Sequence, residues 1–393
     1  RRGRKPQKGP GMGYIHVEID IAQTPKKTGG ICGDSVSSFR TPEATVILLV
    51  DGVGSGIKAN IYANMACSRL EKLLESGFSL RRAFSSLVKT MHESRGSDMP
   101  YAVFSVIRIL NNGEATILAY EMPEAIFIGR HSAAILPRRN FTLEREVISE
   151  SNLFLEPGEG LLLFSDGITL AGIGGKTRLG WNINEICRFV NGSLVAGEKK
   201  KKLYQRIHQH ARELWGTPCG DDCTVLSAFC RRGKVVNIFT GPPAQSGDDR
   251  KVIEDFLALP GTRIVAGATT AQIVAKHLGR ELKINTADTS MIAPPGYSIE
   301  GIDLVTEGAV TLNQLYNILD ADPIYFEPDS SVTRFYDAII DADRINFIVG
   351  TAKNAGHGDI AFRQQGIIPR QKIVELLAEK LTVEGRLIDI KMV

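Results

Sequence analysis

Apolar and polar residues follow a mostly strand-like pattern from residue 14 to about residue 230. The segment 15–21 alternates apolar and polar residues, whereas 44–50 (ATVILLV) is a short apolar run between turn residues and predicts a buried strand. Further strands are predicted at 102–110, 114–120, 125–129, 160–164 and 224–229. Helical spacing of apolar residues predicts helices over 57–75 and 80–92. Strands in quick succession with a pair of long helices predict an α+β domain, an antiparallel β-sandwich flanked by helices.

The pattern changes after the segment 230–233. Strands are predicted at 235–239, 263–266, 303–306, 345–349 and 387–392. Helices are predicted between them at 248–259, 270–278, 312–319, 332–341 and 370–381. Strands that alternate with helices predict an α/β doubly wound parallel sheet. We therefore expect one domain over 14–230 and a second, Rossmann-like domain over 234–393.

The charge distribution argues against a nucleic-acid-binding face. The 393-residue chain has a net charge of +3, but residues 1–11 carry five basic residues and no acid, so the remainder sums to −2. A basic patch across the body of the protein is therefore not expected. We interpret residues 1–13 as a basic arm or a cloning remnant and leave them out of the fold.

Cysteine use and hydropathy predict a reduced, cytoplasmic protein. The six cysteines form no repeated CxxC pairs, which argues against a disulfide framework and a zinc ribbon. Apolar runs stay well short of 18 residues, so no membrane span is predicted.

Three short acidic motifs place an Asp beside glycine or small polar residues next to a predicted strand, and a fourth precedes the strand that carries Asp51. These motifs are Gly33-Asp34-Ser35, Asp51-Gly52-Val53-Gly54-Ser55-Gly56, Ser165-Asp166-Gly167-Ile168-Thr169 and Gly220-Asp221-Asp222-Cys223-Thr224. Carboxylates gathered at strand ends repel one another unless a cation lies between them. Oxygen ligands without a His or Cys majority suit Mg²⁺ or Mn²⁺. Two such ions about 3.5–4 Å apart can share a water and clamp a phosphoryl group.

Each motif taken alone has a simpler interpretation. A single Asp-Gly after a strand is usually only a turn. The segment 52–56 is G-x-G-x-G, which lacks the third glycine of a dinucleotide-binding fingerprint at the required offset. An EF-hand is excluded because alternating acids and a terminal Glu are missing.

The four motifs in this order resemble the metal-dependent protein phosphatase family of the type 2C fold. The similarity is greatest to its bacterial branch of stage-II-sporulation-protein-E-like serine phosphatases, and it covers roughly residues 14–230. The resemblance implies the fold, dependence on two Mn²⁺ or Mg²⁺ ions, and hydrolysis of phosphoserine or phosphothreonine on a partner protein. The implied mechanism is attack by a metal-bridging hydroxide without a phospho-enzyme.

Carried over residue by residue, the resemblance assigns metal ligands. Asp51 corresponds to the Asp that bridges both metals, and Gly52 provides a carbonyl ligand beside it. Asp166 and Asp221 correspond to the later carboxylates that hold one metal, and Asp34 to the early acidic ligand of the other. Asp51, Asp166 and Asp221 are thus the catalytic set. Asp222 is expected to support these ligands from outside the metal shell, and the reverse assignment of Asp221 and Asp222 is the alternative.

Two positions depart from the family pattern. Val53 stands where many eukaryotic members have a His, so no general acid comes from that position. The phosphate-binding Arg near the start of some members has no clear counterpart, and Lys26, Lys27 and Arg40 are candidates by proximity. Two other functions stay open: a pseudo-phosphatase that serves as a ligand-sensing binding module, and a phosphatase for small phosphorylated metabolites.

The second domain has glycine at several predicted strand ends. Gly267, Thr269 and Thr270 lie between a strand and a helix, where N–H groups and hydroxyls could hold a small anionic ligand. Scaffolding or homodimer formation is the alternative role. His357 lies in a loop at 354–359 that could reach a ligand. Three cysteines lie beside the acidic motifs: Cys32, Cys219 and Cys223. Their role is either redox control of the site or simple packing in the core.

Overall fold

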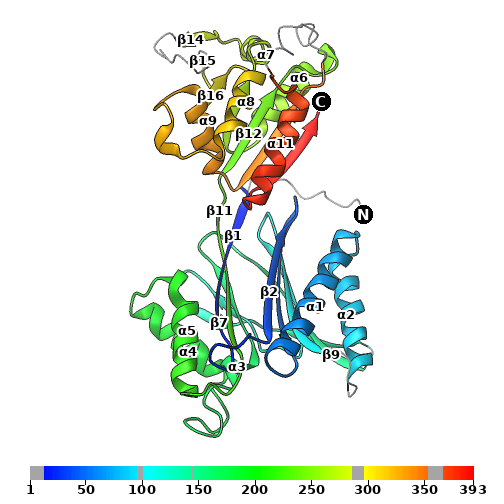
Figure 1. The fold of residues 1–393 in the computed structure, drawn as a ribbon, viewed down its shortest axis with the longest axis vertical. Helices are drawn as coiled ribbons and strands as arrows, with labels where there is room; N and C mark the ends of the chain where they lie inside the picture. The colour runs from blue at the N-terminus through cyan, green and yellow to red at the C-terminus, as the bar shows by residue number, and fades with distance from the viewer. Residues whose placement is uncertain (1–12, 96–100, 144, 286–295, 353–365) are drawn as a thin grey trace, which may run out of the picture. The chain divides into compact units, whose positions relative to one another are not determined.

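The computed structural model describes residues 13–95, 101–143, 145–285, 296–352 and 366–393. The basic segment at 1–11 and the loop at 354–359 lie outside these ranges. Contacts divide the described chain into two compact units, Ile15–Arg232 and Gly233–Val393 together with Tyr14 (Figure 1). No described helix combines the length and apolar character that a membrane span needs.

The first unit contains two antiparallel sheets. The first sheet has the order β1–β11–β10–β6–β7 and the second has the order β2–β3–β4–β5–β9–β8. The strands of the first sheet are β1 (Ile15–Thr24), β6 (Ile126–Ile128), β7 (Ala133–Ile135), β10 (Gly160–Phe164) and β11 (Cys223–Arg232). Those of the second are β2 (Asp34–Arg40), β3 (Ala44–Gly52), β4 (Ala102–Leu110), β5 (Glu114–Tyr120), β8 (Arg139–Leu143) and β9 (Glu146–Phe154). The helices are α1 (Ile57–Glu75), α2 (Leu80–Ser94), α3 (Asp166–Thr169), α4 (Ile183–Val195) and α5 (Leu203–Trp215), with a 3₁₀ turn η1 at Lys200–Lys202.

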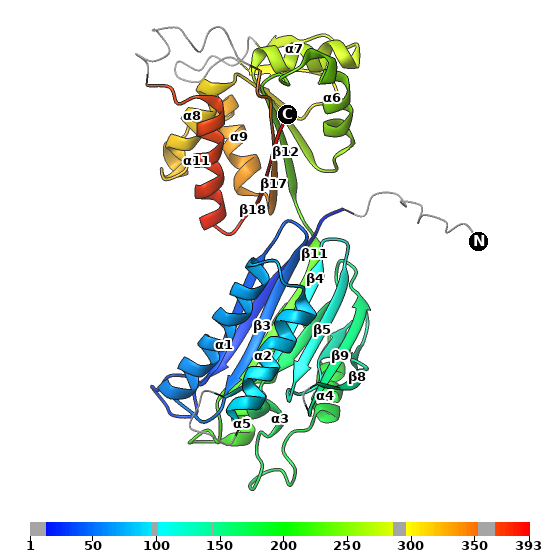
Figure 2. The same cartoon turned by 90° about the vertical axis from the view of Figure 1, so that its right-hand side faces the viewer.

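The apolar strand β3 is buried on both faces. Ile47 and Leu49 pack in the core between the two sheets, whereas Leu48 and Val50 pack against α1 and α2. This double burial explains why the strand is a continuous apolar run rather than an alternating one. The helices α1 and α2 cover one sheet (Figure 2), and α4 and α5 cover the other. The predicted α+β sandwich flanked by helices is confirmed.

Several elements of this unit escaped the sequence pattern, among them three strands and a helix. The strand β2 (DSVSSFR) is an edge strand with few apolar residues, and β8 is a short, largely exposed edge strand. The strand β9 contains Glu146 and Glu150, which are buried because Arg95 and Arg81 pair with them. The helix α4 starts at Asn182, whose side chain accepts hydrogen bonds from two N–H groups of the first turn.

The second unit contains one seven-stranded sheet of order β14–β15–β16–β13–β12–β17–β18. The strands are β12 (Val235–Thr240), β13 (Thr262–Ala266), β14 (Lys283–Asn285), β15 (Gly296–Ser298), β16 (Leu304–Thr306), β17 (Arg344–Val349) and β18 (Leu387–Met392). Strands β16, β13, β12, β17 and β18 are parallel neighbours, and β14 and β15 extend the sheet in antiparallel pairing.

Helices accompany both faces of this sheet. They are α6 (Asp249–Ala258), α7 (Ala268–Leu278), α8 (Ala309–Ile318), α9 (Ser331–Ile340) and α11 (Arg370–Val383), with 3₁₀ turns η2 (Ser246–Asp248) and η3 (Pro323–Tyr325). On the central strand, Val236 and Ile238 pack with α8, α9 and α11, whereas Phe239 packs with α6 and α7. Successive residues of β12 therefore pack into two separate hydrophobic cores, one on each face of the sheet. This double burial explains why the strand is largely apolar.

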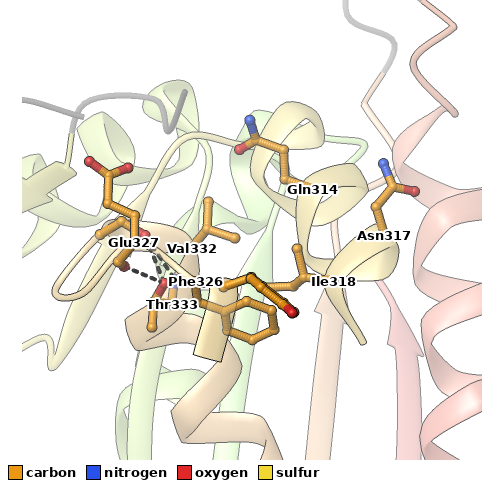
Figure 3. A pocket seen from close by; sticks show the side chains of 9 residues that line it. Gln314, Asn317, Ile318, Phe326, Glu327, Val332 and Thr333 are labelled. Atoms are coloured by element: carbon orange, nitrogen blue, oxygen red, sulfur yellow. Dashed lines mark hydrogen bonds between the residues drawn. The ribbon is translucent and has the colours of Figure 1, made fainter. Parts of the chain in front are cut away.

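A surface cavity of about 290 Å³ lies where α8 and α9 meet the segment between them (Figure 3). Its lining includes the apolar side chains of Ile318, Phe326 and Val332. Glu327 is the one charged side chain among its described lining residues. An apolar cavity with a single carboxylate does not suit an anionic ligand.

Candidate metal centre

The four acidic motifs converge in the folded first unit. Asp34 begins β2 and lies directly opposite Asp51 in the antiparallel register of β2 and β3. Asp166 begins α3 immediately after β10, and Asp221 and Asp222 precede β11. Because β10 and β11 are antiparallel neighbours, the end of one and the start of the other lie at the same edge of their sheet.

A hydrogen bond joins the two sheets at this edge. The Thr224 hydroxyl at the start of β11 donates to Asp34 Oδ2 at 2.5 Å. The backbone N–H of Thr224 donates in turn to Ser165 Oγ at 2.9 Å. Gln23 Nε2 donates to Thr224 Oγ1 at 3.0 Å and to the Asp34 carbonyl at 3.2 Å. These polar residues hold Asp34 in place, and the sequence analysis did not assign them because uncharged polar residues near strands are common.

Burial and mutual repulsion dominate the electrostatics of the cluster. Burial, with Asp222 and Asp166 nearby, raises the pKa of Asp34 to about 7. Burial together with Asp34 and Asp166 raises the pKa of Asp51 to about 9. Burial and Asp166 also raise the pKa of Asp221, while Lys26 opposes that shift. Negative charge is therefore costly in this cluster unless a cation compensates it.

Two carboxylate oxygens in the cluster have no hydrogen-bond partner within the described residues. Asp34 and Asp222 are 2% and 4% exposed, and Asp34 Oδ1 and Asp222 Oδ2 are the unpaired atoms. Buried oxygens normally have a partner. Among the described residues, no three acidic, His or Cys side chains already surround a common point as metal ligands. The donor set, made only of carboxylate and carbonyl oxygens, nevertheless fits Mg²⁺ or Mn²⁺ rather than a thiophilic metal.

Two glycines in the motifs are required by close packing. A Cβ on Gly52 would lie 2.0 Å from the carbonyl oxygen of Ala59 in α1. A Cβ on Gly167 would lie 1.9 Å from the Asp222 carbonyl oxygen. Each glycine therefore lets the backbone approach another segment directly, and this approach fixes Asp51 and Asp166 relative to their neighbours.

Among the three basic candidates, Lys26 lies at the cluster. Its ammonium Nζ is 3.9 Å from Asp221 Oδ1, and its backbone N–H donates to Asp222 Oδ1 at 2.7 Å. Lys27 is exposed on the same loop. Arg40 lies at the far end of β2, six residues and about 20 Å along the strand from Asp34, where its guanidinium donates to the Val17 carbonyl.

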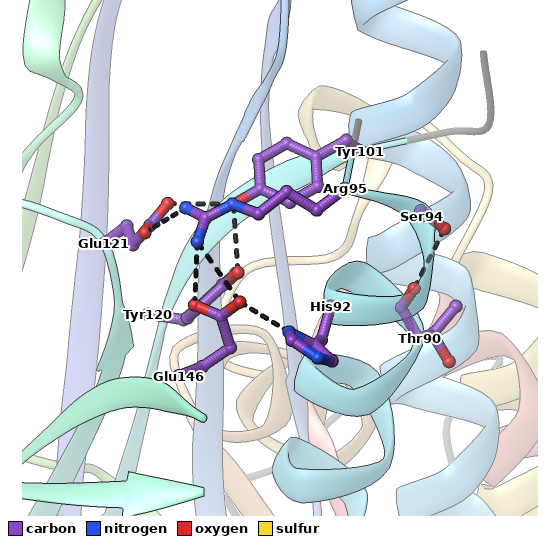
Figure 4. A network of polar contacts seen from close by, with 8 residues as sticks. All are labelled: Thr90, His92, Ser94, Arg95, Tyr101, Tyr120, Glu121 and Glu146. Atoms are coloured by element: carbon purple, nitrogen blue, oxygen red, sulfur yellow. Dashed lines mark hydrogen bonds and ion pairs between the residues drawn. The ribbon is translucent and has the colours of Figure 1, made fainter. Parts of the chain in front are cut away.

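A polar network supports the opposite flank of the Asp51 loop. The backbone N–H of Val53 donates to the Tyr101 carbonyl at 3.1 Å, and the Tyr101 hydroxyl donates to Glu121 at 2.8 Å. The network consists of His92, Arg95, Tyr101, Tyr120, Glu121 and Glu146 (Figure 4). Its centre is the Arg95 guanidinium, which bonds both acidic residues and thereby ties the end of α2 to β5 and β9.

The cysteines beside the motifs are largely buried. Cys219 Sγ and Cys223 Sγ are 3.8 Å apart, and the Cys223 thiol donates to the Gly167 carbonyl. Burial raises the pKa of the Cys32 and Cys223 thiols, which keeps both protonated and unreactive. Of the two interpretations, this burial favours packing.

In the second unit, the predicted ligand-binding turn is partly engaged by its own protein. The Gly267 N–H donates to the Thr306 carbonyl at 2.9 Å. The Thr270 hydroxyl is 1% exposed and accepts from the Gly241 N–H at 2.8 Å. Thr269 is exposed. Thr270 therefore connects two strand-end turns.

Comparison with known proteins gives a family and several similar folds. Residues 41–231 match the family described as Stage II sporulation protein E (SpoIIE). No curated protein sequence matches this chain.

Three solved structures illustrate the structural similarity. The phosphatase domain of the cell fate determinant SpoIIE from Bacillus subtilis is 18% identical, with a TM-score of 0.44 over 56% of this chain and 95% of that one. The RsbU and RsbW domains of a Mycobacterium tuberculosis protein are 16% identical, with a TM-score of 0.46 over 63% of this chain and 69% of that one. RsbX in complex with magnesium is 16% identical, with a TM-score of 0.40 over 56% of this chain and 100% of that one.

The family match covers three of the four acidic motifs, and the fold places the fourth, with Asp34, against Asp51. The resemblance found in the sequence is confirmed for the first unit, whose residues 41–231 match the SpoIIE family.

Proposed function

We propose that the first unit is a metal-dependent serine/threonine protein phosphatase. Its centre is the cluster of Asp34, Asp51, Asp166 and Asp221 with the Gly52 carbonyl. The observation that carries the proposal is the convergence of these carboxylates, remote in sequence, at one buried edge, where Lys26 is a single positive charge beside Asp221. Asp222 supports the cluster through its bond from Lys26 and is the alternative to Asp221 as a ligand.

The proposed chemistry divides between two Mn²⁺ or Mg²⁺ ions and the chain. When bound, the ions supply Lewis acidity, which activates water and neutralises phosphoryl oxygens. Thr224 orients Asp34 through its hydroxyl, and Gly52 brings its backbone against α1. Lys26, beside Asp221, is positioned to contact a phosphoryl oxygen. Val53 has no proton to donate to a leaving group, so that position supplies no general acid.

The surface next to the cluster supports a protein substrate. Apolar side chains recur every four residues from the turn after Gly52 along the outer face of α1. They are Val53 in the turn and Ile57, Ile61 and Met65 on the helix, and each is at least half exposed. A cavity of about 600 Å³ continues from Ile61 and Met65 to Leu87 of α2. Exposed apolar patches mark contact surfaces for other proteins. A phosphoprotein that covers this patch would present its phosphorylated residue to the cluster.

For the second unit, we propose a regulatory role as a doubly wound α/β domain that binds a small anionic ligand. The parallel sheet with helices on both faces supports this proposal. The proposed site lies at the N-terminus of α7 and includes Gly267, Thr269 and Thr270. A ligand can affect the phosphatase only if it binds two states of the protein with different affinities.

Lys26 allows a test of phosphate recognition. Substituting Lys26→Gln should raise KM for p-nitrophenyl phosphate about fivefold or more, because a charged contact to the phosphoryl group is lost. The measurement is steady-state hydrolysis at saturating Mn²⁺. Lys27→Gln is the matched control on the same loop and should behave as wild type. Equal effects of both substitutions, or none from Lys26→Gln, would show that Lys26 does not contact the substrate.

The proposed function is tested by offering purified full-length chain three kinds of compound with Mn²⁺: p-nitrophenyl phosphate, phosphoserine peptides and small phosphorylated metabolites. A protein phosphatase hydrolyses the peptides. A metabolite phosphatase prefers the small compounds, and a pseudo-phosphatase hydrolyses none of them.

A further inference from the structure

Glycines recur at the carboxyl edge of the parallel sheet in the second unit. Each of four neighbouring strands is followed within two residues by a glycine: Gly241 after β12, Gly267 after β13, Gly308 after β16 and Gly350 after β17. The chain proceeds from β12 to β13 and β16 on one side and then returns to β17 on the other side of β12. The edge between β12 and β17 is therefore the point at which strand order reverses, where open α/β sheets bind ligands.

Close packing explains why glycines stand in these turns. A Cβ on Gly350 would lie 2.1 Å from the Pro242 carbonyl oxygen and 2.2 Å from the Gly241 carbonyl oxygen. A Cβ on Gly308 would lie 3.2 Å from the Gly267 Cα. A molecule at this edge would consequently meet backbone groups, the Glu307 carboxylate that accepts from the Gly308 N–H, and side chains that reach the turns from elsewhere.

The guanidinium of Arg370 reaches the reversal point. Arg370 is the first residue of α11, and its Nη1 donates to the Gly350 carbonyl at 3.1 Å. The guanidinium lies so close to Gly241 that a Cβ there would be 1.8 Å from Nη1. Arg370 is half-buried, and no ion-pair partner lies within 4.0 Å of it in the part of the chain that the structure describes. Burial lowers its pKa and the more distant Glu307 opposes that shift.

A buried hydroxyl without a partner lies beside the same turn. Thr240 is the last residue of β12, directly before Gly241, and is 0% exposed. Its Oγ1 has no hydrogen-bond partner among the described residues. Since side chains alternate along a strand, Thr240 projects to the same face as Val236 and Ile238, which pack under α8 and α11. Arg370 at the start of α11 belongs to that face as well.

We propose that this edge binds the oxyanion group of a small metabolite, a phosphate or a carboxylate, with the Arg370 guanidinium as its principal contact and the Thr240 hydroxyl as a second donor. A guanidinium in a partly desolvated position forms strong, directional bonds to such groups. The N-terminus of α7 lies next to the site, because Thr270 at its start binds the Gly241 N–H. This proposal builds on the regulatory role given above to the second unit and places the ligand at residues that role did not include.

A purely structural role for Arg370 would be to clamp the turn at Gly350. In that case its replacement would destabilise the fold without a specific effect on an anion. The two roles are separated by binding measurements on variants that stay folded.

The test is isothermal titration of the full chain with ADP, inorganic pyrophosphate and citrate, in the presence of EDTA. Without divalent cations, the carboxylates of the first unit repel these anions, so binding there does not interfere. ADP and pyrophosphate represent phosphate ligands and citrate represents carboxylates, so the three probes distinguish the two sources of the oxyanion. Phosphatase activity is not part of the readout, so failure here leaves the proposed phosphatase function of the first unit untouched.

Arg370→Gln should weaken binding of the best probe by about tenfold to a hundredfold, the range expected for a lost charged hydrogen bond. Thr240→Val keeps the shape and removes the hydroxyl, and it should weaken binding by about threefold or more while the fold is unchanged by circular dichroism. Lys372→Gln, two residues further along α11 and ion-paired to Glu375, is the matched control and should bind as wild type. Lack of binding by all three probes, or wild-type affinity in both Arg370→Gln and Thr240→Val, would overturn the proposal.

Discussion

Replacing Asp51 or Asp166 by asparagine is expected to lower turnover of p-nitrophenyl phosphate by about a thousandfold or more. Each substitution keeps the size of the side chain but removes the negative charge that a divalent ion requires. Asp51 lies in β3 of one sheet and Asp166 follows β10 of the other, and the charge of Asp166 helps to raise the pKa of Asp51. The measurement is steady-state hydrolysis with Mn²⁺ titrated to saturation.

The control for this prediction is Glu75→Gln, which removes an exposed carboxylate at the end of α1. Its activity should equal that of wild type. Circular dichroism should show that all three variants are folded. Turnover within about tenfold of wild type in both Asp51→Asn and Asp166→Asn would refute the assignment of the metal centre.

Removing the metal should make the thermal stability of the first unit fall as the pH rises from about 5 to about 8. In the metal-free fold, the pKa of Asp34 is raised to about 7 and that of Asp51 to about 9. In the unfolded chain both carboxyl groups titrate near pH 4. The folded chain therefore holds more protons than the unfolded chain across this window, so its free energy of unfolding decreases as the pH increases.

We expect the Tm of metal-free wild type to drop by about 5 °C or more across that range, as seen by scanning calorimetry. Saturating Mn²⁺ should raise the Tm most at the higher pH, because ligand binding to the folded state stabilises it where the carboxylates are charged. Asp51→Asn should be less sensitive to pH than wild type, and Glu75→Gln should not differ. A Tm that rises between the two pH values without metal would contradict the described burial of the carboxylates.

The elements whose apolar pattern reports burial were predictable from the sequence. The strand β3 and the helices α1 and α2 were predicted at nearly their observed bounds because their apolar residues fill the core. Strand β2 was missed, although it carries Asp34, because an edge strand buries little apolar surface. Strand β9 was missed because its buried glutamates are compensated by arginines that are remote in sequence.

The motifs of the candidate site were also visible in the sequence, but their connections were not. The turn residues around Asp51 and Asp166 indicated strand ends. In contrast, the bond between Thr224 and Asp34 joins residues 190 positions apart, and no local pattern predicts such a pair. Lys26 could not be separated from Lys27 by sequence, since only the fold shows which ammonium group faces Asp221. Arg370 was missed because a basic residue at a helix start carries no signal of its own.

The most direct test of the metal-dependent phosphatase is hydrolysis of p-nitrophenyl phosphate by the full chain, measured first with EDTA and then with added Mn²⁺ or Mg²⁺. We predict negligible turnover in EDTA and recovery when either ion is added, because the single ammonium of Lys26 beside Asp221 cannot compensate a cluster of four carboxylates. Equal hydrolysis with and without divalent ions, or none under any metal condition by a folded chain, would contradict the account.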